Sequence, residues 1–339
     1  MNPFSYARPS SVAEAVREVA TNPAAKVIAG GTNLVDLMKY HVERPARLVD
    51  VSRLPGLKQV EARPDGTVRI GALVTNTDAA YHPTVREGWP LLSSALLAGA
   101  TAQLRNAATI GGNLLQRTRC YYFYDAQMPC NKREPGTGCP AISGVNRVHA
   151  ILGHSERCIA THPSDMCVAL AALEAVVHVA GPGGERRIPM AEFHRLPGHE
   201  PERDTNLARD EIVLAVELPA HRFGLHHTYL KLRDRLSYAF ALVSVAAAME
   251  IEDGTIRRAR IALGGVAHKP WRVEAAERMI EGIRPDPRRF DEVAEYLLEG
   301  ARGFQHNAFK IDLARRAIHR ALAQAAAGTP QSQTDKRIA

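Results

Sequence analysis

Three observations predict an α+β protein of two or three domains. The chain's 339 residues exceed what one hydrophobic core usually serves. Short apolar strands and helices alternate over residues 1–220. After a boundary at Pro219 to Gly224, three long strands are followed by three helices. This order predicts a C-terminal domain at residues 225–326, with a three-stranded antiparallel sheet and three helices.

The first helix is predicted by its start and by its apolar stripe. Ser11 and Glu14 have the spacing of a capping box. The apolar residues of the stripe are Val12, Ala15, Val16 and Val19. Next, KVIAGGTNLVDLMKY at 26–40 predicts a short strand, a glycine turn and a short helix, and RLVDV at 47–51 predicts a second strand.

The remaining elements follow from the same patterns. Pro64-Asp65-Gly66 predicts a hairpin within residues 60–72. The other elements before the boundary are helices at 89–100 and 165–175, a hairpin at 176–190 and a strand at 211–219. The long strands lie at 226–234, 239–251 and 256–266, the last two joined through Asp253-Gly254, and the helices lie near 274–282, 290–301 and 309–326. The polar tail, 327–339, is predicted to be disordered.

Composition narrows the function classes. Lys plus Arg exceeds Asp plus Glu by 43 − 36 = 7, but the basic residues are scattered and aromatics are only 6%, which disfavours nucleic acid. Binding of a phosphate-bearing cofactor, or docking on acidic partner subunits, accounts better for the excess of basic residues. There is no run of about 20 apolar residues for a membrane span, and the N-terminus has no signal-peptide core. We therefore expect a cytoplasmic protein, or a periplasmic one if a partner subunit carries the export signal.

Two glycine turns have similar sequences: Ile28 to Asn33 (IAGGTN) and Thr109 to Asn113 (TIGGN). Paired glycines adopt positive φ and let the backbone approach a ligand. Where such a turn opens onto a helix, its N–H groups suit a phosphate. Neither turn fits GxGxxG or GxxxxGK[ST], and Gly183-Gly184 and Gly264-Gly265 show how common such pairs are. The turns alone predict only that a phosphate ligand is possible between them.

Nearly the whole chain resembles the FAD-binding (medium) subunit of molybdenum hydroxylases, the xanthine dehydrogenase, carbon monoxide dehydrogenase and aldehyde oxidoreductase group. The segments that carry the resemblance are KVIAGGTNL (26–34), LRNAATIGGNLL (104–115), HPSDM (162–166), YLKLRDRLSYAFALVSVAAAM (229–249) and IRRARIALGGVAHKPWR (256–272). The resemblance implies an FAD-binding region of two subdomains (PCMH/VAO-type) at 1–220. It also implies a domain like that of the CO dehydrogenase flavoprotein at 225–326.

The resemblance also implies which residues hold FAD. One glycine turn would cradle the pyrophosphate through Lys26, Val27, Ile28, Ala29, Gly30, Gly31, Thr32, Asn33 and Leu34. The other would close on it through Thr109, Gly112 and Asn113. Asp165 would bond the ribityl chain with Ser164 and His162 nearby, and Lys231 would reach the isoalloxazine ring and favour its reduced, anionic form. Plainer roles stay open, since Asp165 can cap the helix at Met166 and Lys231 can be a solvated strand residue.

Four cysteines fall in or beside residues 118–158, a segment rich in Gly, Pro and basic residues with little periodicity. They are Cys120, Cys130, Cys139 and Cys158. Five cysteines without a signal peptide disfavour a disulfide framework. CxxC knuckles are absent, which disfavours a structural zinc site. A 4Fe–4S cluster, in contrast, accepts thiolate ligands from dispersed positions. Spacing alone leaves a metal site and unligated thiols equally open.

The resemblance favours the cluster, because a minority of the family carries a cysteine-bearing insertion here with an extra 4Fe–4S cluster. CYYFYDAQMPCNKREPGTGC and the segment up to HPSDM resemble the periplasmic aldehyde oxidoreductase branch more than the 4-hydroxybenzoyl-CoA reductase branch. Cys120, Cys130, Cys139 and Cys158 would be the ligands. Cys167 lies in an apolar helix and is expected to be a buried free thiol.

The implied function is electron transfer within a heterotrimer or its multiple. A large partner would carry the molybdenum cofactor and oxidise an aldehyde, a small partner would carry 2Fe–2S clusters, and FAD here would reduce a terminal acceptor. The chain itself would then hold no catalytic residue for the aldehyde step. The alternatives are a self-contained FAD oxidoreductase, an FAD subunit of a hydroxybenzoyl-CoA reductase-like enzyme, and a zinc-bound scaffold without flavin.

Overall fold

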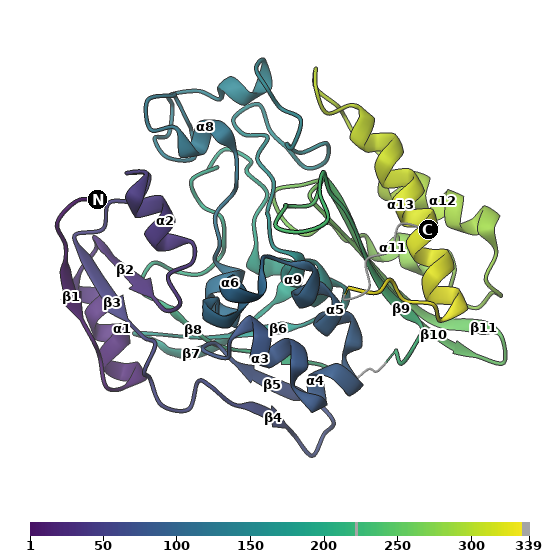
Figure 1. Cartoon of the computed structure of the whole chain (residues 1–339), viewed down its shortest axis with the longest axis horizontal. Coiled ribbons are helices and arrows are strands. Elements are labelled where there is room, and N and C mark those ends of the chain that lie inside the picture. The colour runs from purple at the N-terminus through teal and green to yellow at the C-terminus, as the bar shows by residue number, and fades with distance from the viewer. Residues whose placement is uncertain (221–222, 334–339) are drawn as a thin grey trace.

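Three separate sheets organise the chain (Figure 1). The structure is a computed structural model and describes residues 1–220 and 223–333. Within these residues, none of the helices combines the length and apolar character that crossing a bilayer requires. Sheets and helices remain largely segregated rather than alternating in one sheet, so the fold is the predicted mixture of α and β.

The first sheet is parallel, in the order β1-β3-β2. Its strands are β1 (Ser5–Ala7), β3 (Arg47–Asp50) and β2 (Ala25–Ile28), and helix α1 (Val12–Thr21) packs against it. Ser11 caps α1 as predicted, since its Oγ accepts from the N–H of Glu14 at 3.2 Å. The return bond of the capping box differs, because the Glu14 carboxylate accepts from the N–H of Ser10 (2.7 Å).

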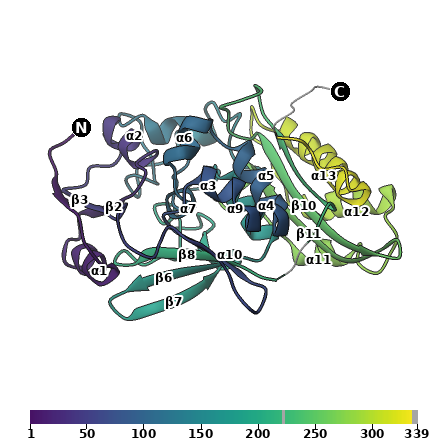
Figure 2. The same cartoon turned by 60° about the horizontal axis from the view of Figure 1, so that its bottom comes forward.

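The second sheet has five antiparallel strands in the order β4-β5-β8-β6-β7. They are β4 (Val60–Ala62), β5 (Val68–Gly71), β8 (Ile212–Leu218), β6 (Val176–Gly181) and β7 (Gly184–Pro189). Most helices of this region lie on one side of the sheet, as Figure 2 shows. The helices between β2 and β8, apart from the cysteine segment, are α2 (Leu34–Lys39), α3 (Asn76–Tyr81), α4 (Pro83–Gly88), α5 (Pro90–Ala98), α6 (Ala102–Ala107), α7 (Ile110–Leu114), α9 (Asp165–Ala172) and α10 (Met190–Phe193).

Residues 118–158 contain little regular structure, namely α8 (Tyr121–Tyr124) and a 3₁₀ turn, η1 (Pro140–Ile142). Side chains here satisfy backbone N–H groups that have no partner in a helix or sheet. The Asn131 side-chain oxygen accepts from the N–H groups of Gly136 (3.1 Å) and Gly138 (2.8 Å). The segment's small buried cluster is built around Leu37, Phe123 and Ile159, together with cysteines.

The C-terminal sheet is antiparallel, in the order β11-β10-β9, and carries helices on both faces. Its elements are β9 (His227–Leu232), β10 (Val243–Glu252), β11 (Thr255–Gly264), α11 (Glu274–Arg278), α12 (Pro287–Leu297) and α13 (Phe309–Ala327). Alternation along β10 explains this arrangement. Val245 and Ala247 belong to the core with α12 and α13, whereas Ala246 and Ala248 belong to the core with α5 and α9.

Several element ends differ from the predictions, among them the start of β10 at Val243 instead of residue 239 and the end of α12 at Leu297 instead of about residue 301. Helix α11 ends at Arg278 instead of about residue 282, and α12 begins at Pro287 instead of about residue 290. The earlier start follows from Asp286, whose side chain accepts from the N–H of Arg288 (2.9 Å), and from a proline at the first helical position.

Residues 327–333, part of the tail that is predicted to be disordered, make defined contacts in the structure. Ala327 ends α13, and Gly328 caps it at φ +64°. Gln331 N–H then donates to Thr228 Oγ1 (2.9 Å), and the Gln333 amide donates to the Tyr229 carbonyl (2.8 Å). Residues 334–339, and residues 221–222 of the predicted domain boundary, lie outside the described residues.

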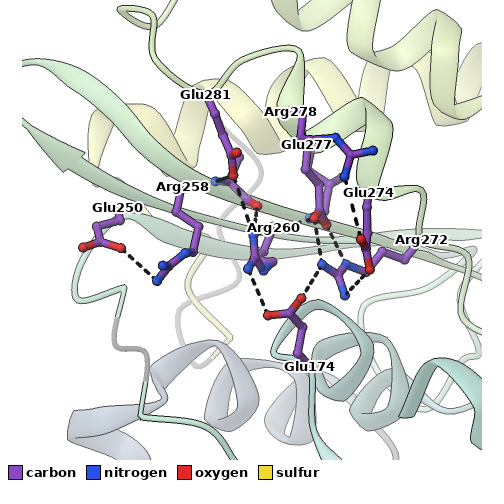
Figure 3. A network of polar contacts seen from close by, with 11 residues as sticks. Glu174, Glu250, Arg258, Arg260, Arg272, Glu274, Glu277, Arg278 and Glu281 are labelled. Carbon is purple, nitrogen blue, oxygen red and sulfur yellow. Dashed lines mark hydrogen bonds and ion pairs between the residues drawn. The ribbon is translucent and has the colours of Figure 1, made fainter. Parts of the chain in front are cut away.

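A buried ionic network joins the two parts of the chain (Figure 3). Arg272 donates from Nε and NH2 to the Glu277 carboxylate at 2.7 and 2.8 Å, and from NH2 to Glu174 at 2.9 Å. Glu174 follows α9, and it also binds Arg260 of β11 at 2.9 Å. Burial alone would lower the pKa of Arg272, but the two carboxylates raise it. The same arginines hold the pKa of Glu174 below its usual value against burial.

We expect Arg272→Leu to destabilise the protein by about 3–5 kcal/mol, because it leaves the Glu277 carboxylate, 2% exposed, buried without its main partner. Arg278→Leu is the matched control, since the Arg278 side chain is 65% exposed and lies 3.8 Å from Glu274. It should cost less than about 1 kcal/mol. Urea unfolding of both variants measures the difference, and equal losses would contradict the role of the network.

Candidate functional site

A cavity of about 770 Å³ opens where the N-terminal region, residues 118–158 and the C-terminal domain meet. Its walls come from the start of α2, the end of α5, helix α7, the loop before α9, and strands β9 to β11 with the loop joining β9 to β10. This volume lies within the range of small-molecule and cofactor sites.

The structure brings many of the predicted FAD residues to this cavity. Those that line it are Thr32, Asn33, Gly112, Asn113, His162, Ser164, Asp165 and Lys231. The predicted residues that are not part of its lining are Lys26, Val27, Ile28, Ala29, Gly30, Gly31, Leu34 and Thr109. Lys26 to Ile28 belong to β2, where they pair with β3, so the strand supports the turn from behind.

The two glycine turns pack directly against each other at Gly30. A Cβ at this position would lie 1.8 Å from the carbonyl oxygen of Ala107, which precedes the second turn. Gly31 has φ +72°, a conformation that favours glycine. The glycine pair therefore allows both the sharp turn after β2 and the close approach of the second turn.

Polar groups in the cavity wall have unused hydrogen-bonding capacity. Asn33 Oδ1 accepts from the N–H of Arg117 (2.8 Å), whereas its Nδ2 is buried and has no partner among the described residues. Asn76 Oδ1 is likewise buried without a partner in the described part of the chain. Orphaned buried polar atoms are costly unless a ligand or water satisfies them, so the wall fits a polar ligand such as FAD.

The second turn is organised by side chains. Thr109 Oγ1 accepts from the N–H of Gly112 (3.1 Å) and so caps α7. Asn113 Oδ1 accepts from the hydroxyl of Ser164 (2.8 Å), which ties this turn to the start of α9. Ser164 in turn caps α9 by accepting from the N–H of Cys167 (3.0 Å). The cap of α9 is therefore Ser164, and Asp165 is the first helical residue.

Asp165 is a charged residue of the cavity wall with two side-chain partners. Its Oδ2 lies 2.7 Å from Lys231 Nζ, and its Oδ1 accepts from the hydroxyl of Tyr229 at 2.8 Å. The side chains of Asp165 and Lys231 are only 9% and 3% exposed. Lys231 also donates to the carbonyl of Ala98 (3.1 Å). Lys231 is therefore a buried member of an ion pair rather than a solvated strand residue.

Several lining residues were missed by the sequence analysis. They are Asn76, Gly99, Arg119, Tyr124, Tyr238, Phe240, Gly264 and Gly265. Tyr238 has a positive φ of 50°, and the Arg119 guanidinium lies 5.0 Å from the Phe240 ring centroid. The sequence does not mark Gly264-Gly265 as different from other glycine pairs. A positive φ is not readable from sequence at a tyrosine, and the other residues reach the cavity only through tertiary packing.

The four predicted ligand cysteines line one small cavity beside the first. Cys120, Cys130 and Cys158 are buried, and Cys139 packs against them. Desolvation raises the pKa of Cys120 to about 12 and that of Cys158 to about 11. It also raises the pKa of Cys139. Such thiols ionise when a bound metal supplies positive charge.

The spacing of the four sulfurs bears on which metal fits. Among the described residues, no three of these four cysteines have all their sulfurs within 4.8 Å of one another. A single zinc ion, with Zn–S bonds of about 2.3 Å, would hold its sulfurs roughly 4 Å apart. Any three of these cysteines therefore include a pair of sulfurs farther apart than such a zinc site would hold them.

His149 lies between the two cavities. Its side chain is buried, and Nε2 lies 3.1 Å from Cys120 Sγ. Burial, with a smaller contribution from the Lys310 charge, lowers the pKa of His149 to about 4. Lys132 is buried on the other side of the cysteines, where it donates to the Pro201 carbonyl (2.7 Å) and pairs with Asp204. Its positive charge lowers the pKa of Cys158 against burial.

A second group of metal-ligand types, His162, Cys167 and His194, lies within 4.8 Å of one another. His162 Nδ1 accepts from the N–H of Ser164 (3.3 Å), so its proton is on Nε2 and it has no free lone pair. His194 Nε2 donates to the Leu114 carbonyl (2.9 Å). We therefore interpret these side chains as packed neutral histidines and a buried thiol, whose pKa burial raises to about 12.

Comparison with known families decides the identity. Residues 2–221 match the FAD binding domain in molybdopterin dehydrogenase, and residues 227–325 match the CO dehydrogenase flavoprotein C-terminal domain. The chain belongs to the FAD-binding subunits of molybdenum hydroxylases. The family predicted from the glycine turns and HPSDM is thus confirmed.

Individual relatives agree. The chain is 51% identical over 329 residues to the aldehyde oxidoreductase FAD-binding subunit PaoB of Escherichia coli K12, covering 96% of this chain and 99% of the relative. It is 29% identical to the carbon monoxide dehydrogenase medium chain of Hydrogenophaga pseudoflava, covering 82% and 80%. A solved structure of quinoline 2-oxidoreductase from Pseudomonas putida 86 is similar with a TM-score of 0.74 and 26% identity, covering 97% and 98% of the two chains. The predicted fold class is confirmed.

We expect Gly30→Ala to lower the FAD content of the purified protein severalfold, because the added Cβ would force the two turns apart at the Ala107 carbonyl. Gly183→Ala is the matched control from another glycine pair, where a Cβ meets nothing within 4 Å. Flavin absorbance per chain measures both variants. Full FAD content in Gly30→Ala would show that this contact does not shape the site.

Acid should destabilise the protein through His194, whose pKa burial lowers to about 4. Between about pH 6.5 and pH 4 the unfolded chain binds a proton there and the folded chain does not. The contribution of His194 to the free energy of unfolding therefore falls by about 1.4 kcal/mol per pH unit as the pH drops. We expect His194→Gln to lose less stability than the wild type between pH 7 and pH 5 in urea unfolding. The exposed His199→Gln should keep the wild-type dependence.

Proposed function

We propose that this chain is the FAD-binding electron-transfer subunit of a molybdenum-containing aldehyde oxidoreductase. The observation that carries the proposal is the large cavity between the two glycine turns, Asp165 and Lys231, in a chain that aligns end to end with an aldehyde oxidoreductase FAD-binding subunit. The expected complex is a heterotrimer or its multiple, with a large molybdenum-cofactor subunit and a small 2Fe–2S subunit. It would lie in the cytoplasm, or in the periplasm if a partner carries the export signal.

The proposed division of the chain is an FAD-binding region at 1–220, with a cluster-binding insertion at about 118–158, and a C-terminal domain at 225–326. FAD supplies the conversion of single-electron arrivals from the 2Fe–2S partner into reduction of a terminal acceptor. The protein's own residues bind and orient it. The end of the first turn at Thr32-Asn33 and the second turn at Gly112-Asn113, which both line the cavity, would face the pyrophosphate.

Around the rest of FAD, Asp165 and Ser164 would meet the ribityl chain, with His162 beside them. Lys231 would face the isoalloxazine ring. Because Lys231 is paired with Asp165, the charge that it presents to the ring is partly offset. Its main contribution would be to orient Asp165 and to donate hydrogen bonds, rather than to supply a full positive charge.

We further propose that Cys120, Cys130, Cys139 and Cys158 hold a 4Fe–4S cluster, which supplies a one-electron carrier beside the flavin cavity. Three features support this. The four cysteines line one cavity, and any three of them include a pair of sulfurs farther apart than around one zinc ion. Burial raises the pKa values of Cys120, Cys139 and Cys158, so their ionisation calls for compensating positive charge. The insertion, with little regular structure, would gain order from the metal.

Cofactor analysis of the anaerobically purified protein tests both proposals. We expect one FAD, four irons and four acid-labile sulfides per chain, without zinc. Each of Cys120→Ser, Cys130→Ser, Cys139→Ser and Cys158→Ser should lower the iron content, because a hydroxyl is a poor substitute for a thiolate ligand.

Cys167→Ser is the matched control, since Cys167 is equally buried but lies in α9 away from the four-cysteine cavity. It should keep its iron and its FAD. One FAD with no iron would leave the flavin proposal standing and overturn the cluster. Electron transfer is tested separately, by reduction of the bound FAD when the complex is given an aldehyde. An unreduced flavin would contradict the proposed role.

A further inference from the structure

Only a thin wall separates the flavin cavity from the four-cysteine cavity. Thr118, Cys120 and His149 are residues that line both. Cys120 brings a sulfur to this wall, and His149 contacts that sulfur, with Nε2 3.1 Å from Sγ. The wall therefore contains a direct polar contact between a proposed cluster ligand and a side chain that also faces the flavin site.

His149 is held in place by the C-terminal domain. Its carbonyl accepts from Lys310 Nζ (2.8 Å) and Asn307 Nδ2 (3.2 Å), and both of these side chains are fully buried. Lys310 Nζ also donates to the carbonyl of Gly265, which lines the flavin cavity. The His149 N–H donates to the Asn146 carbonyl (3.0 Å). The imidazole thus approaches Cys120 from a backbone fixed on several sides.

The chemistry of the contact fixes its direction. A cysteine that ligates metal is a thiolate and has no hydrogen to donate. The contact to Cys120 is then favourable only if His149 Nε2 carries the hydrogen. His149 Nδ1 is buried and has no partner among the described residues, so nothing in the described structure opposes this tautomer.

We propose that His149 is a positioning residue that donates its Nε2–H to the sulfur of Cys120 and thereby raises the reduction potential of the proposed cluster. This inference rests on the proposed 4Fe–4S site. A hydrogen bond to a cluster sulfur favours the more negative, reduced state. The cluster gains or loses one electron by exchange with FAD or the 2Fe–2S partner. No covalent bond changes, and His149 keeps its proton.

The test is an EPR-monitored redox titration of the complex with His149→Phe, which keeps a ring of similar size and removes the donor. We expect full iron and FAD content and a lower midpoint potential for the cluster. A tenfold shift of the one-electron equilibrium between cluster and flavin corresponds to about 59 mV. His149→Gln, whose amide can donate, should restore most of the shift.

His154→Phe is the control, because His154 lies in the same insertion and packs on Phe304 with ring centroids 4.9 Å apart, outside the lining of the four-cysteine cavity. It should leave the potential unchanged. An unchanged potential in His149→Phe, with iron retained, overturns the inference but not the cluster. Absence of iron and sulfide from the wild type overturns the cluster itself, so the two failures are distinguishable.

A second measurement covers the case in which His149→Phe does not assemble. In the wild-type complex labelled with ¹⁵N-histidine, pulsed EPR of the reduced cluster should detect hyperfine coupling to a histidine nitrogen through the hydrogen bond. Among the described residues, His149 is the histidine whose ring nitrogen lies within hydrogen-bonding distance of a sulfur of the four-cysteine cavity. Absence of this coupling would overturn the inference without any variant.

Discussion

The buried carboxylate of Asp165 is the constraint on which the arrangement around the flavin cavity depends. An unpaired charge in this position would be strongly destabilising. Its partners, Lys231 and Tyr229, both come from β9 of the C-terminal domain, at 2.7 and 2.8 Å. Docking of the C-terminal sheet against α9 therefore compensates this charge and stabilises the N-terminal region. This docking completes the wall of the cavity, so stability of the interface and shape of the cofactor site have the same origin.

Other contacts between the two parts of the chain follow the same principle. Arg272 and Arg260 satisfy Glu174 at the end of α9, and Lys310 of α13 satisfies the carbonyls of His149 and Gly265. Each contact buries a charged group and requires a specific geometry, unlike apolar packing, which tolerates sliding. The β10 strand adds apolar packing on both of its faces. The domains are thereby held in a single register.

Much of the fold could be predicted from sequence, because strands, hairpins and most helices follow local patterns such as Pro64-Asp65-Gly66 and Asp253-Gly254. The start of α12 was missed although Asp286-Pro287 gives a local cue. The site was predicted less completely. The resemblance identified the turns and Asp165. The local sequence pattern, however, does not show that the residues of β2 pair with β3 instead of lining the cavity. Asn76, Tyr238 and Gly264 reach the cavity only by tertiary packing, which no local signal records.

The cysteine insertion shows how a weak core and a polar framework can serve one site. Its apolar cluster is small, and buried thiols with raised pKa values add little stability as thiols. Instead, Lys132 is buried against Asp204 on one side, and His149 is fixed by α13 on the other. The partners Asp204 and α13 lie outside the insertion, so both domains help to determine the positions of the sulfurs. Because the wall at Cys120 and His149 is shared with the flavin cavity, the order that a metal gives to the insertion would also shape the flavin site.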